Sequence, residues 1–413
     1  MTLPLSPPQP PLWRVFARFL GPMLLANVLQ SLSGTLNNVY IGQMIGVRAL
    51  AAVSSFFPVM FFFIAFVIGL GAGSSVLIGQ AWGALQPDKV KAVAGTAISV
   101  GLLMGLPIAL FGGIFAQDLL RLLGTPADVL ADATTYARIM LIGMPGLFVF
   151  LLITSLLRGV GDTVTPLLAL VLSTAMGLLV TPALIRGWAG LPQLGVASGA
   201  WATIVCFMVA LAFMALHLRR KGSPLAPDRQ LLLALRVDGG ILRTVLRVGI
   251  PTGVQMIVVS LAEVALLTLV NGFGSDATAA YGAVNQVVAY VQFPAISIAI
   301  TASILGAQAI GAGKSGRLGA IARTGLWMNV VLTGGLVALC YLFSRALLGF
   351  FITSEPVIAV AQTLLHIMLW SCVVFGMAAV LSGVMRASGT VLVPTAISIF
   401  CIAAIEVPVA WGV

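Results

Sequence analysis

Two glutamates stand inside long apolar runs and are the residues best suited to chemistry. Glu263 is the only charged residue between positions 248 and 271, and Glu406 ends a run that starts after Arg386. A charged carboxylate deep in a membrane costs on the order of 2.5–3.5 kcal/mol, and an apolar setting favours its neutral form. Such a group can take up and release a proton, or give oxygen ligands to a sodium ion. The alternative is a protonated glutamate in a structural hydrogen bond between helices.

Amide side chains are the other polar groups in the apolar runs. Asn285 and Gln292 are seven residues apart and therefore share one face of a helix, where they could line a cavity. Gln80 and Gln308 stand in the glycine-rich segments GQAWGA and GAQAIGAG, and small residues there let helices approach closely. For this second pair we expect hydrogen bonds between helices and a packing role.

The sequence has none of the patterns of common catalytic or metal sites. HExxH, GxSxG and GxxxxGK[ST] are absent. The two histidines, His217 and His366, are isolated, and the four cysteines form no CxxC motif. We therefore expect no enzyme, no cofactor and no metal site, apart from a sodium ion at Glu263 as one option for the coupling ion.

The composition indicates what surrounds these groups. Hydrophobic residues make up 60% of the 413 residues and charged residues only 8%, against roughly 25% in an ordinary soluble domain. A spanning helix needs about 20 mostly apolar residues, and eleven runs reach this length. They are 19–47, 49–87, 92–117, 139–157, 163–185, 187–218, 248–271, 277–313, 324–344, 356–385 and 387–405. Continuous apolarity of this length predicts an all-α polytopic membrane protein rather than a β-barrel.

The basic residues are unevenly distributed between the loops. With the N-terminus in the cytoplasm, sixteen of the 21 Lys and Arg residues fall on the cytoplasmic side and five on the other. This is the positive-inside bias, and it explains the net charge of +10 without a nucleic-acid partner. We expect a multi-pass protein of the cell inner membrane with a cytoplasmic N-terminus.

The second half of the chain repeats the first at a constant offset of 228 residues. The matched pairs include Gly46 with Gly274, Gln80 with Gln308, Arg158 with Arg386, Gly161 with Gly389 and Pro166 with Pro394. Six spans in the first half is an even number, so both halves enter the membrane from the same side. The repeat predicts two parallel-related six-helix bundles, an arrangement typical of secondary transporters.

The repeat also divides the chain. We expect a cytoplasmic tail at 1–18, a first lobe of six helices at 19–217, a basic cytoplasmic linker at 218–247 and a second lobe at 248–413. The sixth helix starts near Gly195, so its partner is expected near residue 423, beyond Val413. We therefore expect eleven helices here, with helix 12 missing from the second lobe.

Several motifs resemble those of the MATE family, the multidrug and toxic compound extrusion transporters. They are GTLNNVYIGQMIG, GLGAGSSVLIGQAWGALQPDKVKAV, SLLRGVGDTVTP and their counterparts in the second half. The resemblance runs from about residue 20 to the end. It implies two six-helix lobes arranged as a V, and export of organic, often cationic, compounds driven by inward flow of protons or sodium ions.

The chain departs from the family at most of the family's carboxylates. Where the family usually carries an Asp in helix 1, this chain has Asn37 or its neighbour Asn38. Where some members carry Asn and Asp in helix 5, it has Gly177 and Thr181. The family's helix-7 Glu falls on Glu263. The resemblance thus implies that Glu263 is the main ion-coupling residue.

These observations predict a secondary antiporter that exports small organic compounds, cationic or amphiphilic, in exchange for H⁺ or Na⁺. Glu263 would bind the coupling ion with Glu406 as helper, and Asn37, Asn285 and Gln292 would line a substrate cavity between the lobes. The partners expected are small organic substrates and the lipid bilayer, and the chain is expected to be a monomer. The alternatives are a flippase for lipid-linked precursors, which would need a cationic cavity, and a receptor without transport.

Overall fold

A computed structural model describes residues 11–190, 192–351 and 354–412, and no strand occurs within these ranges. The first half contains α1 (Leu12–Met44), α2 (Val47–Gly83), α3 (Pro87–Leu122), α4 (Leu130–Gly159), α5 (Val164–Arg186) and α6 (Ala197–Lys221). The second half contains α8 (Gly239–Asn271), α9 (Ser275–Gly311), α10 (Leu318–Leu342), α11 (Ser344–Gly349), α12 (Glu355–Ala387), α13 (Leu392–Cys401) and α14 (Val407–Gly412). Across the described ranges, eleven helices are long and apolar enough to span a membrane, which confirms the predicted fold class.

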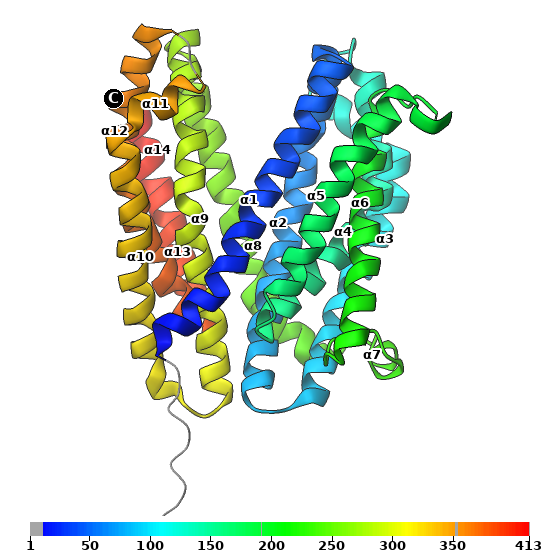
Figure 1. Cartoon of the computed structure of the whole chain (residues 1–413), viewed down its shortest axis with the longest axis vertical. Helices are drawn as coiled ribbons and strands as arrows, with labels where there is room; N and C mark the ends of the chain where they lie inside the picture. Colours follow the sequence, from blue (N-terminus) through cyan, green and yellow to red (C-terminus); the bar gives the residue numbers. More distant parts are fainter. Residues whose placement is uncertain (1–10, 191, 352–353, 413) are drawn as a thin grey trace, which may run out of the picture.

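The helices form two groups that diverge from a common end. The helices of the first half, α1 to α6, form one group, and those of the second half from α9 onward form the other (Figure 1). The two groups lie close together at the end where α2 and α9 finish and are far apart at the opposite end, with α8 between them (Figure 1). The arrangement is the V that the family resemblance implied, and its two groups are the bundles that the internal repeat predicted.

The first helix of each half crosses to the other lobe. Phe16 and Leu20 of α1 are buried against Ile298 and Ala302 of α9. α8 lies against α2, where a Cβ atom on Gly73 would overlap the backbone of Val245 in α8. Gly69 and Gly73 follow the small-xxx-small spacing that lets two helix backbones meet. The close α2–α8 contact therefore leaves no room for a side chain at either position.

The linker between the halves is folded onto the first lobe. It contains α7 (Arg229–Leu233), whose N-cap residue Asp228 accepts a hydrogen bond from the backbone N–H of Leu231. Lys91 of α3 lies 2.7 Å from the same carboxylate. This hydrogen bond from Lys91 is the main reason that the pKa of Asp228 is lowered. The basic linker predicted at 218–247 is therefore fastened to α3.

Helix ends extend past the predicted apolar runs. α1 begins at Leu12 and α8 at Gly239, before the predicted starts at 19 and 248, because basic residues such as Arg14 and Arg243 continue the helix beyond its apolar part. The last span is interrupted by a π-helical turn, η3 (Ile402–Glu406). Pro408 has no N–H to donate to the carbonyl one turn earlier, and π-helical turns occur where the α-helical ladder is broken.

Candidate functional site

A cavity of about 400 Å³ lies inside the first lobe. Residues from α1, α2, α4, α5 and α6 line it, and no Asp, Glu, Lys or Arg is among them. Its apolar wall includes Phe56, Tyr136, Met140 and Phe207, and the rings of Phe56 and Tyr136 meet edge to face with centroids 6.0 Å apart. A volume of this size with few polar groups is typical of a small-molecule site.

Most of the polar side chains of this cavity come from α1 and α5, and Tyr136 of α4 and Thr203 of α6 add two more. Asn37 and Asn38 reach it from α1, and Gly177 and Thr181 from α5. At these four positions, on α1 and α5, the chain departs from the polar residues of the family. The structure therefore brings the first-lobe departures together in one cavity whose wall carries no charged residue.

One buried hydroxyl group beside the cavity lacks a partner. Thr174 lines the cavity, and its Oγ1 atom is buried and makes no hydrogen bond to any described residue. A buried polar group without a partner is costly, so a rotation of this side chain toward the cavity would be favoured if a guest molecule offered it a hydrogen bond there.

The other two amides predicted for the cavity lie elsewhere. Asn285 and Gln292 are half-buried on α9 in the second lobe, and neither lines the first-lobe cavity. Gln292 makes a side-chain contact with Cys372 of α12. The structure thus brings Asn37, but not Asn285 or Gln292, into the first-lobe cavity, which is contained in one lobe instead of lying between the two.

The two glutamates are neighbours in the second lobe. Glu263 lies on α8, and Glu406 closes the π-helical turn that contacts α8. Both residues are exposed at the surface of the chain. Carboxyl groups on neighbouring elements can take up a proton, and they offer oxygen ligands of the kind that hard metal cations prefer.

The common end of the lobes is closed by a reciprocal pair of hydrogen bonds. Gln80 of α2 donates from Nε2 to the backbone oxygen of Ala387 at the end of α12, 2.9 Å away. Gln308 of α9 donates in the same way to Gly159 at the end of α4, also 2.9 Å away. Both donors and both acceptors are related by the 228-residue repeat. We refer to these four residues as the glutamine clasp, and it confirms the hydrogen bonds expected for the two glutamines.

Two glycines let the backbones meet beside the clasp. A Cβ atom on Gly83 would overlap the backbone oxygen of Gln308, and one on Gly311 would overlap that of Gln80. Gly83 and Gly311 are also related by the offset of 228. Equivalent residues of the two halves therefore form the seam, which is the contact between the lobes at Gln80, Gly83, Gln308 and Gly311.

Comparison with known proteins gives the same architecture. The MatE family model matches residues 22–183 and again 251–411, which together are most of the chain. The chain belongs to the MatE family. The two matches confirm the internal repeat, and membership in this family of transporters agrees with the expectation that the chain is not an enzyme.

Individual relatives of this MatE chain match over nearly its full length. It is 45% identical over 403 residues to the probable multidrug resistance protein YoeA of Bacillus subtilis, covering 98% of this chain and 87% of that one. A crystal structure of a mutant of the Vibrio cholerae MATE transporter VcmN superposes with a TM-score of 0.88, at 22% identity, over 97% of this chain and 89% of the other. An outward-facing multidrug resistance MATE family transporter gives a TM-score of 0.87 at 22% identity, with 97% and 88% covered. The two structural matches show the shared fold.

Most of the cavity wall could not be found from the MatE sequence alone. Tyr136, Met140, Thr174 and Phe207 come from three helices and share no motif. Each reads as an ordinary apolar or hydroxyl residue of a spanning helix. Asn37, at which a family carboxylate is replaced, is the cavity residue that could be predicted from the sequence.

Proposed function

We propose that this MatE protein exports small organic compounds, cationic or amphiphilic, across the cell inner membrane in exchange for H⁺ or Na⁺. The observation that carries the proposal is the uncharged, aromatic cavity of about 400 Å³ in the first lobe. Aromatic faces attract organic cations, and an apolar wall with a few amides binds varied compounds because dispersion does not demand one geometry. The names of relatives such as YoeA, a probable multidrug resistance protein, support a drug-like substrate.

Coupling would take place in the second lobe. Glu263, with Glu406 beside it, would bind the proton or the sodium ion, since charged groups in spanning helices rarely face lipid and usually mark an ion pathway. Substrate and ion would then occupy different lobes. Each would influence the other through the seam at which the lobes meet.

The glutamine clasp supports alternating access with a cytoplasmic N-terminus. The ends joined by the clasp carry most of the basic loops, so this closed end would face the cytoplasm. Opening toward the cytoplasm would break two hydrogen bonds from glutamine side chains and separate Gly83 from Gly311. With this orientation, the V would be the state that is open to the outside.

The test is transport in reconstituted vesicles. Vesicles holding the full chain receive a fluorescent organic cation and either a proton gradient or a sodium gradient. The proposal predicts flux under one of the two gradients. In Glu263→Gln this flux falls by about 5–150-fold, the range of an ordinary coupling free energy of 1–3 kcal/mol. The gradient that drives flux identifies the ion.

A matched control separates coupling from general loss of charge. Glu355 is an exposed acid that pairs with Arg345 at 2.5 Å, so Glu355→Gln should keep wild-type flux. Equal flux in wild type and Glu263→Gln would overturn the role of Glu263. The flippase alternative lacks support from the first-lobe cavity, whose wall has no basic residue to bind a pyrophosphate.

A further inference from the structure

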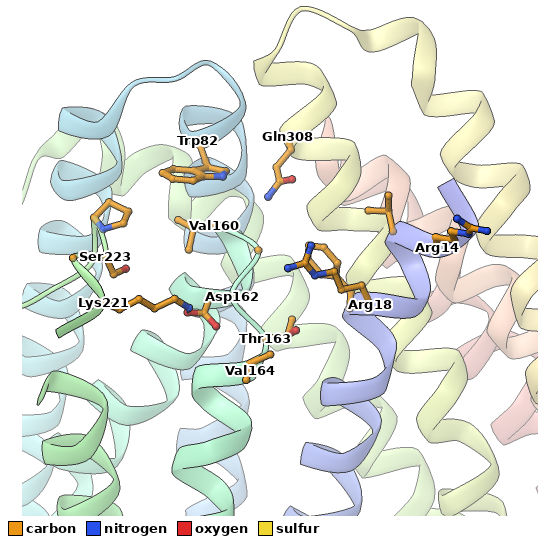
Figure 2. Close-up of a pocket in the computed structure, with 15 residues that line it drawn as sticks. Arg14, Arg18, Trp82, Val160, Asp162, Thr163, Val164, Lys221, Ser223 and Gln308 are labelled. Atoms are coloured by element: carbon orange, nitrogen blue, oxygen red, sulfur yellow. The ribbon is translucent and has the colours of Figure 1, made fainter. Parts of the chain in front are cut away.

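A second cavity, of about 690 Å³, lies at the end of the molecule where the lobes meet. One wall is the start of α1, and the opposite wall is formed by the α4–α5 loop and the end of α6. Figure 2 shows Arg18 reaching from α1 toward the space, with Lys221 and Asp162 on the other side. This cavity is separate from the first-lobe cavity and from the two glutamates.

The cavity carries an excess of positive charge. Arg14 and Arg18 are one helical turn apart on α1, and both line the space; in Figure 2 the Arg18 side chain points toward Asp162 and Lys221, and the Arg14 side chain points to the other side of α1. Neither makes an ion pair or a hydrogen bond with a described residue, although Arg14 lies over the ring of Trp13, 5.2 Å from its centre. Two unneutralised guanidinium groups on one wall repel an organic cation and attract an anion.

The third basic residue is already neutralised. The Nζ atom of Lys221 lies 2.8 Å from a carboxylate oxygen of Asp162. Burial alone would disfavour the charged form of Asp162. Hydrogen bonds from Lys221 and Thr165 outweigh burial and lower the pKa of this carboxyl, so the pair stays charged at neutral pH. Arg14 and Arg18 are therefore the basic groups of this cavity that remain available to an anion.

Part of the wall is apolar, and it lies at the level of a membrane surface. Phe19, Trp82 and Val164 line the cavity next to the charges, at the ends of spanning helices. Basic pockets between spanning helices on the cytoplasmic side are suited to anionic lipid headgroups. We propose that this cavity binds the phosphate group of an anionic phospholipid, with Arg18 and Arg14 as its positive ligands and the apolar wall against its glycerol and upper acyl chain.

The proposed lipid would touch both lobes. The start of α1 is packed on the second lobe through Phe16 and Leu20, and Gln308 of the same lobe also lines the cavity. The opposite wall, with Asp162 and Lys221, belongs to the first lobe. A bound phosphate therefore joins the lobes beside the glutamine clasp and favours the arrangement in which this end is closed.

The experiment is native mass spectrometry of the purified full chain with added phosphatidylglycerol or phosphatidylcholine. Wild type should retain phosphatidylglycerol in preference. Each basic residue near a membrane surface contributes about 1 kcal/mol, so the double variant Arg14→Gln/Arg18→Gln should lower this preference by at least about tenfold. The matched control is Arg48→Gln/Arg121→Gln, which removes two exposed arginines from the opposite end of the molecule and should change little.

A second variant is expected to increase lipid affinity, a result that misfolding could not produce. Asp162→Asn keeps one oxygen, which can accept the hydrogen bond from the backbone N–H of Thr165, but removes the charge that neutralises Lys221. It should therefore bind phosphatidylglycerol about fivefold more tightly. An unchanged or weaker affinity in Asp162→Asn, or equal losses in the two double-arginine variants, would overturn the proposal. Displacement of the lipid by millimolar inorganic phosphate would overturn the assignment to a lipid and show a site for free phosphate.

Discussion

The two lobes of this MatE protein differ most at positions that the repeat makes equivalent. The residue corresponding to Glu263 in the first lobe is Thr35, which only donates to the backbone oxygen of Ser31 in its own helix. The residue corresponding to Glu406 is Leu178, which lines the uncharged cavity. One lobe thus carries two neighbouring carboxylates where the other has an uncharged, aromatic cavity.

The closed end of the molecule shows the opposite pattern. Gln80 and Gln308 make the same hydrogen bond to the other lobe, and Gly83 and Gly311 allow the same backbone contact. The seam between the lobes is therefore symmetric, whereas the proposed ion and substrate sites are divided between the lobes. Substitutions at equivalent positions of the two halves test this division, beginning with the symmetric seam.

The largest effect is expected from adding a methyl group to the seam. Gly83→Ala and Gly311→Ala each place a Cβ atom into the backbone of the opposite lobe, and such overpacking costs about 1–3 kcal/mol. The two variants should lower the thermal stability of the detergent-purified protein equally. Gly319→Ala, where nothing lies within 4 Å, is the control. A large effect in only one of the two variants would contradict the claim that the two halves contribute equally to the seam.

The glutamine clasp should give a smaller but equally symmetric effect. Gln80→Leu and Gln308→Leu each remove a donor and leave a backbone oxygen without its partner, at a cost of about 0.5–1.5 kcal/mol. Each should raise labelling of a single cysteine placed at the seam by about two- to tenfold. Unequal rates for the two variants would contradict equal roles for the two halves of the clasp.

Substrate affinity should depend on one lobe only. Asn37→Leu and Thr174→Val each remove a polar group from the first-lobe cavity, so the Kd of a fluorescent organic cation should rise about fivefold for each, the value of one hydrogen bond. Gln292→Leu, in the second lobe, should leave the Kd unchanged. A larger change in Gln292→Leu than in Asn37→Leu would move the substrate site to the second lobe.

The smallest effect concerns an ion pair without a counterpart. Asp162 corresponds to Thr390, so its pair with Lys221 exists in one lobe. Because its pKa is lowered in the folded state, the pair stabilises the protein above the usual Asp pKa of about 3.9, and this contribution disappears as the pH falls through the folded-state pKa. Asp162→Asn should therefore be less stable than wild type at pH 7, by at most about 1 kcal/mol, and equally stable at the lowest pH tolerated. A difference that grows on acidification would contradict this sign.

Much of the fold could be predicted from the sequence, because lipid imposes continuous apolar runs and the repeat fixes which helices correspond. The repeat also identified Gln80 and Gln308 as a pair that bonds between helices, because they occupy equivalent positions of the two halves. The cavity could be predicted only where a family carboxylate is replaced, as at Asn37. The position of Asn285 and Gln292 was less predictable: their spacing puts them on one face of α9, but spacing alone does not show which neighbour that face meets. The partner of Asp162 is Lys221, the last residue of α6, and no local pattern shows where that helix end meets the α4–α5 loop.

The proposed division places the ion in the second lobe and the substrate in the first. Its most direct test is to add a permanently charged organic cation to the purified protein in weak buffer and measure the protons, or in sodium medium the sodium ions, that are released. We predict that wild type releases about one ion per bound substrate, if the coupling free energy between ion and substrate binding is about 1–3 kcal/mol. Glu263→Gln should bind the substrate and release none. Release of the same ion in equal amount from wild type and Glu263→Gln would contradict the division between the lobes.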